Sequence, residues 1–143
     1  HKLTGKTSLM PALIEVLLLA AASDGSIDKH EQSYILRTLH YTKELRSFTQ
    51  HDLAGIQRQL HEKLVRGSTQ DDILKVAGLQ LGEQKRNIAY ALALELCYTN
   101  ANVDEGERRY LKLLRDTWDL DKGVVHSIHL SAELRYGDAL PVI

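Results

Sequence analysis

Apolar residues recur along this chain at helical spacing, with no alternating stretch long enough to predict a strand. The segment 9–22 is apolar on nearly every face, and Pro11 suits its first turn, so it is predicted to be a buried helix. Glu15 interrupts this run, which is also too short to span a bilayer, so we do not interpret it as a signal or membrane segment. The segment 83–98 has the same apolar character, and we expect the two helices to pack against each other.

The remaining apolar residues are spaced three or four positions apart, as on amphipathic helices. Gly67 and Gly82 stand where two of these helices are expected to end, and Ser68 or Thr69 is a suitable N-cap between them. Together with the two apolar segments, these amphipathic helices predict an all-α domain of about seven helices. The predicted amphipathic helices cover about 28–41, 53–67, 69–81, 105–118 and a last helix after Asp121.

The polar turn after the first apolar segment is repeated after the second, as residues 24–31 and 100–107. Each copy carries one aliphatic residue, followed by Asp-x-x-Glu before the next helix. We therefore predict a single domain, 1–143, containing two helix-turn-helix hairpins around two buried central helices. The hairpins correspond to about 9–41 and 85–117, which we expect to superpose.

Both turns carry more oxygen-bearing side chains than a helix start requires. An N-cap Asp followed three residues later by Glu forms a capping box, which explains part of each turn. The additional residue at the start of each turn has no role in capping. If the turns meet in the fold, they offer oxygens to one hard divalent cation, Ca²⁺, Mn²⁺ or Mg²⁺ in preference to Zn²⁺. The candidate metal ligands are Asp24, Asp28, Glu31, Asn100, Asp104 and Glu107.

The first turn is not a complete EF-hand calcium loop. Asp24, Asp28 and Glu31 match the later ligand positions of such a loop. Ala20 and Ala22 stand at its first two ligand positions, and neither side chain offers an oxygen. Capping and cation binding therefore remain two open interpretations of these turns.

Histidines elsewhere form weaker candidate sites. His126, His129 and Glu133 share one face of the last predicted helix, at a spacing that suits a transition metal. No fourth ligand is identifiable, so we interpret them as a solvated or structurally satisfied group and expect no zinc there. His51 and Asp52 have no companion motif and receive the same interpretation.

The chain lacks the sequence signatures of common catalytic sites. It has no Gly-x-Ser-x-Gly motif, no glycine-rich phosphate loop and no cysteine with an assignable histidine partner. The single cysteine, Cys97, lies in an apolar run and is predicted to be a small buried residue in a reducing compartment. We therefore do not expect an enzyme.

Composition and charge are those of one globular domain. The chain has 143 residues, of which 43% are hydrophobic, and a formal net charge of −1. This balance gives no bulk attraction for nucleic acid or an anionic membrane. A basic second quarter beside acidic turns suits docking to proteins, and its residues are Lys43, Arg46, Arg58, Lys63 and Arg66.

At the paired turns the sequence resembles the TerB family of tellurite-resistance and chemical-stress proteins. In that family an apolar helix leads into Asp-Gly-x-Ile-Asp-x-x-Glu, and a second copy follows in the same chain. The resemblance covers about Leu9 to Leu120, and the second copy departs from the pattern at Asn100 and Ala101. The matching residues are Ala22, Asp24, Gly25, Ile27, Asp28 and Glu31 in the first copy and Val103, Asp104 and Glu107 in the second.

The resemblance implies a seven-helix cytoplasmic protein that binds metal through the acidic turns. It also implies partners among the proteins of a stress-response complex, with peripheral association at the inner membrane through those partners. A metal-free, co-chaperone-like protein-interaction adaptor is the alternative function. A metal-dependent enzyme built on the same acidic residues is a more distant third.

Overall fold

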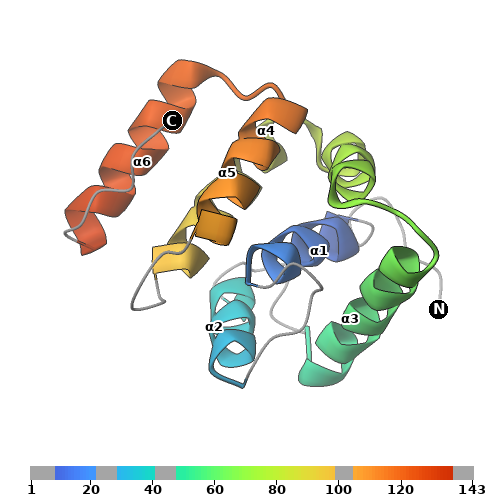
Figure 1. Cartoon of the computed structure of the whole chain (residues 1–143). Helices are drawn as coiled ribbons and strands as arrows, with labels where there is room; N and C mark the ends of the chain where they lie inside the picture. Colours follow the sequence, from blue (N-terminus) through green and yellow to red (C-terminus); the bar gives the residue numbers. More distant parts are fainter. Residues whose placement is uncertain (1–8, 22–28, 41–47, 99–104, 137–143) are drawn as a thin grey trace.

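The computed structural model describes residues 9–21, 29–40, 48–98 and 105–136, which form six helices and no strand. The predicted all-α class is therefore confirmed. Figure 1 colours the helices along the sequence and shows α1 at the centre of the arrangement and α6 at one edge. They are α1 (Leu9–Ala21), α2 (Lys29–His40), α3 (Gln50–Val65), α4 (Gln70–Tyr98), α5 (Glu105–Thr117) and α6 (Lys122–Tyr136).

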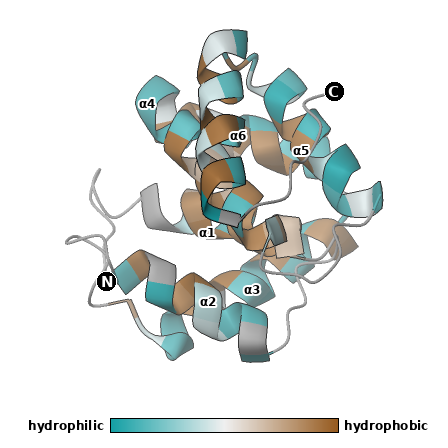
Figure 2. Ribbon diagram, turned by 90° about the vertical axis from the view of Figure 1, so that its left-hand side faces the viewer, coloured by the Kyte–Doolittle hydropathy of each residue, from teal (hydrophilic) through white to brown (hydrophobic). Residues whose placement is uncertain are grey.

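The apolar helix α1 is buried along most of its length, as its sequence predicts. It packs mainly against α4 and also contacts α3 and α5, so every face of its middle turns meets another helix. The outer helices carry both hydrophilic and hydrophobic residues, and Figure 2 shows the two colours on α2. No helix within the described ranges combines the length and the apolar character needed to cross a membrane.

The one carboxylate in the middle of α1 is buried and ion-paired. Glu15 lies in the core, and its Oε2 is 2.5 Å from Nζ of Lys63 on α3. The lysine is about half exposed, so its stem covers the carboxylate while its ammonium group remains near water. Because an unpaired carboxylate would be unfavourable in the core, this pair fixes α3 against α1.

The predicted fourth and fifth helices form one element, α4, with a break at Gly82. Gly82 has φ 78° and ψ 169°, a backbone conformation that residues other than glycine rarely adopt. The break falls at the predicted boundary, but no loop follows it. This direct junction explains why the described residues form six helices where we predicted about seven. Arg86 stabilises the junction, because its Nε donates a 2.7 Å hydrogen bond to the Gly78 carbonyl.

The two halves of α4 bury different neighbours. In the first half, Gly78 leaves space for the indole of Trp118, whose Nε1 donates to the Leu74 carbonyl at 2.7 Å. In the second half the buried residues include Cys97, as predicted. Ile88 is 49% exposed, so the apolar character of this half extends beyond its buried face. The fully buried residues of the second half are Ala89, Tyr90, Ala93, Leu94, Leu96 and Cys97.

Capping boxes begin α3 and α4. The Thr49 amide donates to Asp52 Oδ2 at 2.9 Å, and the Asp52 amide donates to Thr49 Oγ1 at 3.2 Å. Thr69, one of the two predicted caps of α4, makes the same exchange with Asp72 at 3.0 and 3.1 Å. The hydrogen bonds from Thr69 lower the pKa of the Asp72 carboxyl. In the His51-Asp52 dipeptide, the aspartate therefore serves as a helix-capping residue.

Candidate binding site at the end of α1

Two of the six predicted metal ligands lie within the described residues. Glu31 is half-buried in the first turn of α2, and Glu107 is in the first turn of α5 with only 8% of its surface exposed. The other four, Asp24, Asp28, Asn100 and Asp104, lie outside the described residues. The position of Glu107 is therefore the main structural information on the candidate site.

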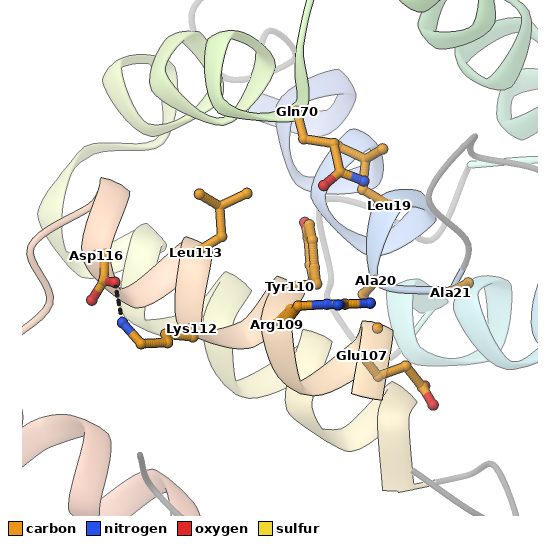
Figure 3. A pocket seen from close by; sticks show the side chains of 11 residues that line it. Leu19, Ala20, Ala21, Gln70, Glu107, Arg109, Tyr110, Lys112, Leu113 and Asp116 are labelled. Carbon is orange, nitrogen blue, oxygen red and sulfur yellow. Dashed lines mark hydrogen bonds and ion pairs between the residues drawn. The ribbon is translucent and has the colours of Figure 1, made fainter. Parts of the chain in front are cut away.

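Glu107 lines a cavity of about 680 Å³ at the junction of α1, α4 and α5, shown in Figure 3. Ala20 and Ala21, in the last turn of α1, line the same cavity. In the sequence, the first acidic turn follows shortly after Ala21, and the second leads into the first turn of α5. The helix ends that flank the two turns therefore meet at one cavity, which also includes Leu19, Gln70, Gly106, Arg109, Tyr110, Lys112, Leu113 and Asp116.

Helix dipoles make the two ends of this junction electrostatically different. The C-terminal end of α1 presents carbonyl groups without intrahelical partners, which favour a nearby cation. The N-terminal end of α5 favours a carboxylate, and Glu107 lies there. A cation between these ends would be attracted both by the carbonyl groups and by the carboxylate.

The opposite end of the cavity holds charges that are already paired. Lys112 Nζ is 2.8 Å from Asp116 Oδ2, as marked in Figure 3. The hydrogen bond from Lys112 lowers the pKa of the Asp116 carboxyl. Arg109 lies nearer Ala20 in the same view, and it forms no ion pair with the residues that the structure describes. The cavity therefore carries both signs of charge, and in Figure 3 the Arg109 side chain lies beside Ala20 while the Glu107 carboxylate points away from Arg109.

Tyr110, which also lines the cavity, has a structural role. Its hydroxyl donates a 2.7 Å hydrogen bond to the Val16 carbonyl of α1. Complete burial raises the pKa of this phenol well above its usual value. Tyr110 therefore remains neutral near pH 7 and fixes α5 against α1.

The histidines on the predicted face of α6 have different environments. His129 is 6% exposed, and its Nε2 lies 2.6 Å from the hydroxyl of Tyr90. His126 and Glu133 are exposed to solvent. Within the described ranges, no three His, Cys, Asp or Glu residues lie close enough together to hold a metal ion. His129 belongs instead to a buried hydrogen-bond network that sequence spacing did not predict.

Comparison with known proteins finds no matching family model, no matching curated protein and no matching solved structure.

Proposed function

We propose that this chain is a TerB-like, non-enzymatic binding module of the tellurite-resistance and stress-response type. In this proposal the acidic turns hold one divalent cation, Ca²⁺, Mn²⁺ or Mg²⁺, and the module acts in the cytoplasm with other proteins of a stress-response complex. The observation that carries the proposal is the shared cavity, because Ala21 and Glu107 bring the flanks of the two turns together.

The environment of Glu107 supports a ligand role. Water competes less for a carboxylate that is 8% exposed than for a solvated one, so its attraction for a cation is stronger. Hard divalent cations prefer carboxylate and carbonyl oxygens, and both are present where α1 ends and α5 begins. The all-α class is also the class that the TerB resemblance implies.

The test is thermal unfolding of the native chain and of Glu107→Gln and Glu31→Gln, each in chelator and in millimolar Ca²⁺, Mn²⁺ or Mg²⁺. A capping box accepts Gln in place of Glu, whereas a hard cation needs the carboxylate. We expect the native protein to gain about 2.7 kcal/mol at a hundredfold excess of cation over its Kd, and both variants to lose most of that gain.

Glu105→Gln is the matched control, because Glu105 is an exposed glutamate in the same helical turn as Glu107. It should retain the full response to cation. If the native protein melts identically in chelator and in cation, the metal-binding part of the proposal is wrong.

The second candidate function is a metal-free protein-interaction adaptor. It is favoured by large aliphatic side chains that are mostly exposed on three different helices. Val65 of α3, Leu79 of α4 and Leu134 of α6 are 73%, 79% and 87% exposed. Identical melting in chelator and in cation would favour this function over cation binding.

A further inference from the structure

The outer face of α6 combines aliphatic and small residues, although it is exposed to solvent. The buried residues Val125, His129 and Ala132 define the inner side of this helix, which packs mainly against α4. At about 3.6 residues per turn, the opposite side carries two leucines one turn apart. Leu130 and Leu134 are 47% and 87% exposed. The outer face consists of the exposed residues Gly123, Val124, Ser127, Leu130, Ser131 and Leu134.

This outer face carries no charge, which is unusual for a surface helix. α6 lies at the edge of the bundle in Figure 1. A helix in that position normally presents charged residues to solvent on the side opposite its buried residues. In α6, His126 and Glu133 lie instead on one flank of the outer face. Neighbouring exposed leucines without charged residues between them are typical of a surface that binds another protein.

We propose that the outer face of α6 is the interface of a weak homodimer, in which the two α6 helices pack antiparallel about a two-fold axis. The axis passes midway between Ser127 and Leu130. Leu130 of one copy then lies opposite Ser127 of the other, and Leu134 lies opposite Gly123. Each leucine therefore meets a residue that is small enough to leave space for it.

The order of small and large residues favours a second copy of this chain as the partner. Antiparallel pairing needs a helix whose large residues lie as far from its centre as its small ones, and both pairs in α6 meet this condition. Parallel pairing would place Leu134 against Leu134 and leave Ser127 against Ser127. One end of the interface would then be crowded and the other poorly filled.

The charges on the flank of α6 also fit the antiparallel arrangement. The two-fold axis places the same flanks of the two copies side by side. On the flank with His126 and Glu133, the imidazole of one copy lies roughly 3 Å along the helix from the carboxylate of the other. Both side chains are exposed in one chain. An imidazole can donate a hydrogen bond to a carboxylate, so the flank supports the apolar contact twice.

The size of α6 predicts a reversible dimer. The helix has 15 residues. At about 1.5 Å per residue it is roughly 22 Å long. One pair of such helices buries less than the roughly 1,200–2,000 Å² of a stable interface, so the dimer belongs to the weak class. We therefore expect monomer and dimer to exchange between micromolar and millimolar chain concentration.

Sedimentation equilibrium of the full chain tests the dimer. The mean mass should rise from 16.1 kDa at low micromolar concentration toward twice this value near millimolar concentration. Leu134→Glu should raise the Kd by at least about a hundredfold, because two-fold symmetry removes the leucine from two contacts at once. Leu134 is exposed in the monomer, so this variant should fold with native helical circular dichroism.

Leu79→Glu is the matched control. Leu79 is a leucine of α4 with 79% exposure, close to the exposure of Leu134, but it lies outside the proposed interface. The control should keep the native Kd. A loss of dimerisation in both variants would indicate a nonspecific effect of added charge and would contradict the proposed interface.

Cross-linking of mixed cysteine variants tests the orientation of the helices. The axis places Val124 of one copy near Leu134 of the other, whereas equal residues lie more than about 13 Å apart along the helix. A short bis-maleimide reagent should therefore join Val124→Cys chains to Leu134→Cys chains more than it joins either variant to itself. The native Cys97 is buried and should not react.

Three results would overturn the inference. The first is a native chain that remains monomeric near millimolar concentration. The second is a Leu134→Glu variant that dimerises as the native chain does. The third is cross-linking that joins equal cysteine variants in preference to unequal ones, because it would require parallel helices.

Discussion

Replacement of Gly78 by alanine is a sensitive test of how α4 and α5 pack. An ideal Cβ at Gly78 would lie 2.5 Å from Nε1 and 2.7 Å from Cδ1 of Trp118. Both distances are far below van der Waals contact, and the atoms belong to a rigid buried ring. The indole must therefore move, and its 2.7 Å hydrogen bond to the Leu74 carbonyl is lost or lengthened.

Two opposing effects determine how much Gly78→Ala changes the free energy of unfolding. Alanine is favoured over glycine inside a helix by about 1 kcal/mol. Overpacking a well-packed core costs about 1–3 kcal/mol, and loss of the indole hydrogen bond costs about 1 kcal/mol more. The steric effect is larger, so Gly78→Ala should reduce the free energy of unfolding by roughly 1–3 kcal/mol.

Gly55→Ala is the matched control, since Gly55 also lies inside a helix but has open space around it. The nearest atom to a Cβ there is the end of the flexible Arg58 side chain, at 4.0 Å. This variant should gain roughly 0.5–1 kcal/mol. Urea unfolding followed by helical circular dichroism measures both changes. If Gly78→Ala is as stable as Gly55→Ala, the described contact between α4 and Trp118 is incorrect.

Two further predictions concern the core around α1. Leu18→Ala and Leu94→Ala each remove a fully buried side chain and should each cost about 2–5 kcal/mol in the same urea assay; a loss below about 1 kcal/mol would contradict their central position. Lys63→Met should cost roughly 1–3 kcal/mol, because it leaves the Glu15 carboxylate buried without its cation. The double variant with Glu15→Gln should recover much of that loss, and a double-mutant cycle with no coupling energy would refute the role of the pair.

Helix positions were largely predictable because periodicity and end signals are local properties. The apolar run of α1 needs neighbours on several sides, and the structure provides them. Gly82 was correctly placed at the boundary between two helical segments. Sequence could not show that the second segment continues without a loop, because that depends on the backbone conformation of Gly82 and on the Arg86 contact.

The role of His129 was not predictable from spacing. His126 and His129 are three residues apart, which separates them by about 60° around a helix. Spacing alone therefore places both histidines on one broad face, whereas in the structure His129 is buried and His126 is exposed. The useful signal was Tyr90, a polar group in a nearly all-apolar helix, which must find hydrogen-bond partners if it is buried.

The candidate cation site was predictable only in part. The repeated Asp-x-x-Glu pattern correctly indicated that Glu31 and Glu107 lie in first helical turns. The cavity beside Glu107 arises from packing between α1 and α5, which are far apart in sequence. Whether the two turns bind a cation remains a prediction.

Isothermal titration of the metal-stripped native chain with Ca²⁺, Mn²⁺ and Mg²⁺ tests this prediction most directly. The proposal predicts saturable binding of one cation per chain for at least one of the three metals, with binding lost in Glu107→Gln and retained in Glu105→Gln. Absence of saturable binding by all three metals at millimolar concentration would contradict it.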